Sequence, residues 1–296
     1  MSGPLIALQV TLGLFLVGFL VFWFRLGRPQ ADDDRGWPRP GELGVGFVTN
    51  FFDTLGIGSF APTTALYRLF RLVPDERIPG TLNVGHTPAT VVQAFIFTTL
   101  VDVEFTTLAV LIAAAVLGAW LGAGVVAGWP RRRIQFGMGI ALLVAAVLFT
   151  LTNLGIVAGG GTATGLSGGL LAAAAAGNFV LGALMTLGIG LYGPCLIMIS
   201  LLGMNPKVAF PIMMGSCAFL MVVAGIRFLK AGAYRQRASL GLTLGGIPAV
   251  LIAAFIVKSL DLANVRWLVA AVVTYTGVTM LWSATRSMRT AAGSEQ

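Results

Sequence analysis

The sequence predicts an all-α polytopic membrane protein, with seven spanning helices and two re-entrant broken-helix hairpins arranged as an inverted repeat. The 296-residue chain is 57% hydrophobic and only 10% charged, with a mean hydropathy of +0.90, whereas soluble domains carry roughly 25% charged residues. A nine-residue segment, TLGIGSFAP at Thr54–Pro62, recurs as TLGIGLYGP at Thr186–Pro194. The basic residues lie in short clusters between apolar runs, where they set the orientation of membrane helices.

Charge and cysteine content exclude several other classes of protein. The formal net charge is +8, from 19 basic and 11 acidic residues, but its clustering between apolar runs indicates membrane orientation and no nucleic-acid partner. Cys195 and Cys217 both lie inside apolar runs, so they indicate neither a disulfide framework nor a metal site. No cofactor is expected.

The first element is an apolar run from Leu5 to Phe24, about long enough to cross a hydrocarbon core of ~30 Å. It lacks the basic start of a signal peptide and is followed by Arg25 and Arg28. We therefore expect a spanning helix with its N-terminus outside. The polar stretch 29–40 that follows is a connector.

Eight further apolar runs follow the connector: 44–70, 81–100, 106–128, 134–157, 171–202, 208–229, 239–257 and 265–284. If all eight cross the membrane, Lys and Arg divide 10 inside against 9 outside, which is no bias. If the two glycine-broken runs instead turn back at mid-membrane, the division is 16 against 3. The positive-inside rule favours the second arrangement, with the N-terminus outside and the C-terminus cytoplasmic.

This topology divides the chain into two repeats of opposite orientation. Each repeat has one hairpin and three crossings, and the odd number of crossings inverts the second copy. The expected parts are an N-terminal helix with its connector at 1–43, repeat 1 at 44–158, a glycine-rich linker at 159–170, repeat 2 at 171–285 and a cytoplasmic tail at 286–296.

The two broken runs predict an anion site at the membrane midplane. A half-helix of ~11 residues rises ~16 Å, which is half of a ~30 Å core. Each returning half begins after a glycine pair, with Pro62 or Pro194 in its first turn, where a missing N–H does no harm. Each helix N-terminus carries roughly half a positive charge. Two opposed N-termini would hold a small oxyanion without any Lys or Arg.

The substrate-binding candidates come from both breaks and from the crossings that follow them: Gly56, Gly58, Ser59, Phe60, Pro62, Asn83, His86, Gly188, Gly190, Tyr192, Pro194, Cys195 and Ser216. Asp53 is the only acid within the apolar runs and His86 is the only histidine. Both are candidates for proton coupling. The alternatives for Asp53 are a cation site or a carboxyl capped near the bend, and the alternative for His86 is helix packing.

Both repeats carry a Gly-x-Gly-x-x-x-Pro break, followed by a crossing with small and polar residues and then a glycine-rich helix. In these features the chain resembles the TauE/SafE sulfite exporter family, also called TSUP, over nearly its full length after the first helix. The resemblance implies an inner-membrane carrier of sulfite, sulfonates or related small anions. The matching positions are Gly56, Gly58, Pro62, Gly188, Gly190 and Pro194. Many relatives have a denser glycine run at this break, so the choice of anion stays open.

The leading functional hypothesis is a secondary transporter, and not an enzyme, that moves a small sulfur-containing oxyanion of the sulfite, sulfonate or thiosulfate type. Its partners are this anion, membrane lipid and protons, and the sequence does not indicate an oligomeric state. One alternative is an intramembrane sulfur-transfer enzyme that uses Cys195 or Ser59 with His86 as base. Others are a carrier of a non-sulfur organic anion and a channel.

Overall fold

The structure is a computed structural model that describes residues 3–27, 36–56, 58–74, 77–126, 154–156, 160–186 and 190–257, with single residues and pairs within 132–151 and 267–285. The described part contains helices and no named strand. Its elements are α1 (Gly3–Leu26), α2 (Pro40–Thr54), α3 (Phe60–Leu69), α4 (Ile78–Gly85), α5 (Thr87–Leu100), α6 (Phe105–Val126), α8 (Gly168–Met185), α9 (Tyr192–Leu201), the 3₁₀ turn η3 (Pro206–Val208), α10 (Ala209–Ala231) and α11 (Gln236–Val257).

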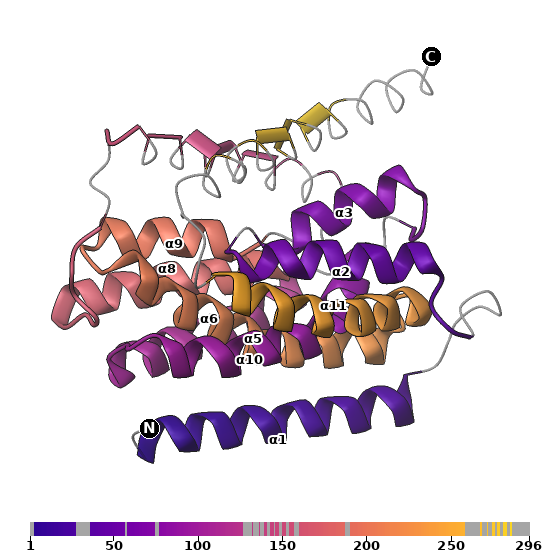
Figure 1. Cartoon of the computed structure of the whole chain (residues 1–296), viewed down its shortest axis with the longest axis horizontal. Helices are drawn as coiled ribbons and strands as arrows, with labels where there is room; N and C mark the ends of the chain where they lie inside the picture. Colours follow the sequence, from indigo (N-terminus) through magenta and orange to yellow (C-terminus); the bar gives the residue numbers. More distant parts are fainter. Residues whose placement is uncertain are drawn as a thin grey trace.

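Five described segments are long and apolar enough to cross a membrane: α1, α6, α8, the segment from η3 through α10, and α11. The long helices run roughly alongside one another (Figure 1). The helix α10 lies at the centre, since nearly its whole length from Ala209 to Gly225 is buried. The described positions within 132–151 and 267–285 are also helical. The prediction of an all-helical chain with several membrane spans is therefore confirmed.

The helix α1 lies along one edge of the bundle (Figure 1) and packs against α5 and α10. Its inner face places Phe15 edge-on to Phe219, with ring centroids 5.3 Å apart. Near its end, the buried Trp23 donates from Nε1 to Gln236 Oε1 at 2.7 Å. The outer face exposes apolar side chains such as Val10 and Leu14, which suits contact with lipid.

The crossing expected as one helix at 81–100 is two helices, α4 and α5, which meet at His86. Pro88 in the first turn of α5 has no N–H to donate to the Val84 carbonyl, so the hydrogen-bond ladder is interrupted there. Bonds from His86 N to Leu82 O and from Thr90 N to His86 O continue on either side. The crossing therefore bends without separating, and the interruption places His86 at the bend.

The helices that precede the two breaks each pack against a helix from the other half of the chain. The helix α2 packs along α11, and α8 packs along α6. A Cβ atom added at Gly241 would lie 2.7 Å from Glu42 Cβ, and one at Gly122 would lie 2.7 Å from Ala183 Cα. The repeated pairs Gly118-x-x-x-Gly122 and Gly241-x-x-x-Gly245 therefore let helices approach backbone to backbone.

The described helical positions within 132–151 and 267–285 also meet reciprocally. A Cβ atom at Gly139 would contact Leu281, and one at Gly277 would contact Leu143. Leu143 follows Gly139 by four positions, and Leu281 follows Gly277 by four positions. Each glycine therefore contacts the leucine of the other segment. Reciprocal contacts of this kind are typical of a two-fold relation.

The glycine-rich linker forms defined contacts before α8 begins at Gly168. Ala163 forms an isolated β-bridge with Met204, and Asn205 N donates to Ala163 O at 2.9 Å. Glu104 N donates to Thr164 O at 2.9 Å. The linker thus binds both the loop between α5 and α6 and the loop between α9 and η3.

Candidate functional site

The first break lies between α2 and α3, as the sequence predicts. Gly56 and Gly58 have φ angles of +88° and +86°, a region that strongly favours glycine. Phe60 begins α3, and Pro62 lies in its first turn. The descending helix is longer than expected, because it begins at Pro40 with proline in its first turn and with Glu42 in a capping box at Arg39.

The second break lies between α8 and α9. The helix α8 ends at Met185, and α9 begins at Tyr192 with Pro194 in its first turn. Gly190 lies between them, while the predicted site residue Gly188 lies outside the described residues. The expected length of this half-helix, ~11 residues, is wrong: α8 begins at Gly168 and has 18 residues, so it rises ~27 Å.

Both breaks open onto one pocket. Gly58, Ser59 and Phe60 line it from the first break, and Gly190, Leu191 and Tyr192 line it from the second. The remaining lining residues are Asp53, Thr90, Met185, Cys217 and Met221. Its empty volume is about 210 Å³, but the free space inside has room for only about one water molecule. This conformation of the pocket is therefore narrow.

A chain of hydrogen bonds joins the two breaks beside the pocket. Tyr192, the first residue of α9, donates from its hydroxyl to Gln93 Oε1 at 2.8 Å. Gln93 Nε2 donates to Asp53 Oδ2 at 2.9 Å and to Thr54 Oγ1 at 3.0 Å. The hydroxyl and backbone N–H of Ser59, just before α3, also bond the Asp53 carboxylate. Asp53 is 2% exposed. Because Ser59 bonds it, its carboxylate lies at the N-terminus of α3, where backbone N–H groups favour an anion.

His86 does not line the pocket. Its Nδ1 lies 3.0 Å from Asn50 Oδ1 and its Nε2 lies 3.0 Å from Thr63 Oγ1. Asn50 donates from Nδ2 to Gly46 O at 2.7 Å, so its Oδ1 can only accept, which places the proton of His86 on Nδ1. Thr63 then donates to Nε2. Both ring nitrogens are used in holding α2 and α3 to the bend between α4 and α5.

Ser216, a buried residue of α10, also bonds a polar side chain of a helix that leads into a break. It accepts from Asn178 Nδ2 of α8 at 3.0 Å, and the same nitrogen donates to Leu111 O at 2.7 Å. Asn83 donates from Nδ2 to Pro79 O at 2.9 Å. Neither Asn83 nor Ser216 lines the pocket. The same is true of four other predicted site residues, Gly56, Pro62, Pro194 and Cys195.

The alternative of a sulfur-transfer enzyme needs a nucleophile within hydrogen-bonding distance of His86. The ring partners of His86 are Asn50 and Thr63, and neither Cys195 nor Ser59 is bonded to it. Cys195 is buried and free. The described geometry therefore contains no Cys–His or Ser–His pair.

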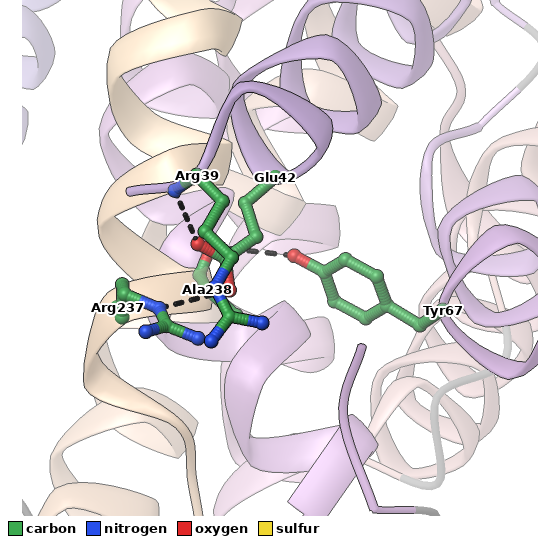
Figure 2. A network of polar contacts seen from close by, with 5 residues as sticks. All are labelled: Arg39, Glu42, Tyr67, Arg237 and Ala238. Atoms are coloured by element: carbon green, nitrogen blue, oxygen red, sulfur yellow. Dashed lines mark hydrogen bonds and ion pairs between the residues drawn. The ribbon is translucent and has the colours of Figure 1, made fainter. Parts of the chain in front are cut away.

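A second polar cluster joins α2 to α11 away from the pocket (Figure 2). Arg237 Nε lies 3.2 Å from Glu42 Oε1, and Arg39 N donates to Glu42 Oε2 at 2.7 Å. The Tyr67 hydroxyl donates to Ala238 O at 3.3 Å. Glu42, which the sequence places in the connector, is thus a buried residue of α2. The cluster fixes the first turns of α2 and α11 to each other and to α3.

Sequence reasoning missed Leu191 at the second break and five residues of the surrounding helices: Thr90, Gln93, Met185, Cys217 and Met221. A signal existed for Gln93, because an amide within an apolar crossing requires buried polar partners. The remaining four have side chains that are common in membrane helices. Only the three-dimensional approach of α5, α8 and α10 to the breaks brings them to the pocket.

The comparisons with known proteins agree with this description. The family model described as "Sulfite exporter TauE/SafE" matches residues 2–149, which include α1 and the described part of repeat 1. Neither the curated proteins nor the solved structures contain a match. Repeat 2 is related to the matched half through the internal duplication of the break. The chain is a multi-pass membrane protein that belongs to the TauE/SafE sulfite exporter family.

Proposed function

We propose that the protein is a secondary transporter that carries a small sulfur-containing oxyanion, of the sulfite, sulfonate or thiosulfate type, across the cell inner membrane. One observation carries this proposal: the N-terminal ends of α3 and α9, one from each repeat, line the same pocket. Membership of a sulfite exporter family supports it.

The electrostatics of the pocket favour a single small anion. Each helix N-terminus contributes roughly half a positive charge, so two contribute about one. The described residues that line the pocket include no Lys or Arg, so its donors are backbone N–H groups and the hydroxyls of Ser59, Thr90 and Tyr192. Such donors bind oxyanions well when water is excluded.

The remaining wall of the pocket favours an anion with a soft, polarisable side. Met185, Cys217 and Met221 bring three sulfur-containing side chains to it. Thioethers are polarisable and adapt their shape to an apolar surface. The sulfur lone pair of sulfite, the terminal sulfur of thiosulfate or the alkyl group of a sulfonate would face this wall while the oxygens face the helix ends.

The same proposal includes the topology of seven crossings and two re-entrant hairpins, with the N-terminus outside and the C-terminus cytoplasmic. The distribution of basic residues supports it. The exchanged packing of α2 with α11 and of α8 with α6 supports an inverted repeat. In such transporters one repeat rocks against the other around a fixed midplane site.

The test is transport by purified protein in liposomes with labelled sulfite, thiosulfate and methanesulfonate, and with acetate as an organic anion without sulfur. We expect saturable flux of at least one sulfur-containing anion and none of acetate. Transport of acetate alone would indicate a carrier of non-sulfur anions, and flux that does not saturate would indicate a channel. No flux of any of the four would refute the proposal.

Two glycine variants locate the site. Gly58→Ala adds a methyl group at a φ of +86° beside Tyr192 Cβ, 3.8 Å away. Gly168→Ala is the matched control, since its φ of +55° is also unfavourable for alanine but nothing lies within 4 Å. We expect flux to fall severely in Gly58→Ala and to stay near wild type in Gly168→Ala. Equal flux in both variants would remove the break from the transport site.

A further inference from the structure

We propose that the ionised carboxylate of Asp53 occupies the anion site itself, so that the transported anion binds only after Asp53 has taken up a proton. This inference rests on the proposed function and assigns its coupling ion. In this proposal Asp53 competes with the substrate for the anion site. Gln93, which donates to Asp53, is the residue whose hydrogen bond changes with the charge of Asp53.

The position of the carboxylate supports this assignment. Asp53 lies three residues before Gly56, the first positive-φ glycine after α2, and the chain turns back so that Ser59 bonds its carboxylate through both hydroxyl and backbone N–H. These are donors that an anion at the N-terminus of α3 would use. Asp53 and Ser59 both line the pocket, as does Tyr192 at the start of α9.

Among the described residues, those that face Asp53 include no compensating cation. From α5 it meets the amide of Gln93, and just before α3 the hydroxyl of Ser59. The titratable groups that face it are the Tyr192 hydroxyl from α9 and the Cys217 thiol from α10. Neither is a cation in any protonation state. The N–H groups at the N-terminal ends of α3 and α9 therefore supply positive potential at the carboxylate.

Charge and volume together make the two anions exclude one another. The helix ends supply about one positive charge, which the ionised Asp53 already balances. A second anion would add an uncompensated buried charge, and the pocket has room for about one water molecule. When a carboxylate oxygen of Asp53 accepts a proton from water, the side chain becomes neutral. A monoanion then restores the original charge balance of the pocket.

Protonation also changes the connection between the two repeats. Gln93 holds Asp53 with Nε2 and Tyr192 with Oε1. A hydrogen bond to a carboxylate is roughly twice as strong as one to a neutral acid. Neutralising Asp53 therefore weakens the chain Tyr192–Gln93–Asp53 that ties the start of α9 to the end of α2. The same proton that admits the anion loosens the contact between the two breaks.

The experiment compares sulfite affinity of wild type and Asp53→Asn over a range of pH. Sulfite itself titrates in this range, but its titration is common to both proteins, so the ratio of the two affinities isolates Asp53. We expect the affinity of wild type, relative to that of Asp53→Asn, to fall about tenfold per pH unit once Asp53 is ionised. In liposomes with a pH gradient across the membrane, wild type should accumulate sulfite and Asp53→Asn should not. Parallel pH profiles for the two proteins would overturn the proposal.

A measurement on wild type keeps the test independent of how well the variant folds. Sulfite and thiosulfate are added to the protein in weak buffer at alkaline pH, and the proton uptake is recorded with an indicator. Beyond the protons that sulfite takes up in buffer alone, we expect about one proton per bound anion. Saturable transport without this uptake would overturn the role of Asp53 and leave the transport function intact. Failure of binding by all tested anions would instead remove the proposed function.

Discussion

The close approach of α6 to α8 leads to a quantitative prediction for Gly122→Ala. A Cβ atom at Gly122 would lie 2.7 Å from Ala183 Cα and 2.9 Å from its Cβ and O, whereas carbon atoms in contact are optimally about 3.5–4.0 Å apart. Two of these three atoms belong to the backbone, so no rotamer change relieves the clash and the helices must separate. Overpacking of this kind costs about 1–3 kcal/mol.

A gain in helix propensity opposes this cost. Replacing glycine by alanine within a helix stabilises it by about 1 kcal/mol. The net loss expected for Gly122→Ala is therefore about 0–2 kcal/mol. A domain of 150–250 residues changes its melting temperature by about 2–4 °C per kcal/mol, so we expect a decrease of up to about 8 °C.

The assay is thermal unfolding of the purified protein in detergent at a fixed scan rate, followed by tryptophan fluorescence. Gly18→Ala in α1 is the control, because no atom lies within 4 Å of its added Cβ; its melting temperature should stay equal or rise. Gly241→Ala tests the other interface, where the added Cβ would lie 2.7 Å from Glu42 Cβ. A melting temperature of Gly122→Ala that equals that of Gly18→Ala would refute backbone-to-backbone packing of α6 and α8.

Three more predictions follow from the topology and the two buried polar networks. Arg71→Cys and Lys207→Cys should react with a membrane-impermeant maleimide from opposite sides, and labelling of both from one side would mean that the broken runs cross the membrane completely. Thr63→Val leaves His86 Nε2 without its donor, so the free energy of unfolding should fall by about 1–3 kcal/mol. Thr63→Ser keeps the hydroxyl and should stay near wild type; an equal loss in both variants would contradict this reasoning. Glu42→Gln removes the charge that faces Arg237 and should lower the melting temperature, with less than additive loss when both partners are replaced.

The breaks were predictable because their causes are local. Gly56 and Gly58 adopt positive φ angles between α2 and α3, and Pro62 suits the first turn of α3. The start of α2 was misplaced although it is also local, since Pro40 and Glu42 form a helix start that hydropathy alone does not register. The bend at His86 has the same kind of origin, in the missing N–H of Pro88.

The roles of the polar residues were less predictable, because they depend on distant partners. His86 was a candidate for both anion binding and helix packing, and only the positions of Asn50 and Thr63 show that its two nitrogens are used within the fold. Gln93 bonds Tyr192, a residue 99 positions away. Cys195 follows Pro194 in sequence but does not line the pocket, whereas Cys217 of α10 does.

The sequence by itself determined the membrane class, the internal duplication and the places where the chain cannot continue as a helix, because hydropathy and the backbone chemistry of glycine and proline act within a few residues. The tertiary structure decided which of the candidate residues share a pocket. The first residues of α3 and α9 meet because small residues let α2 approach α11 and α8 approach α6. Contacts between helices far apart in the chain depend on the shapes of both surfaces, which no local pattern contains.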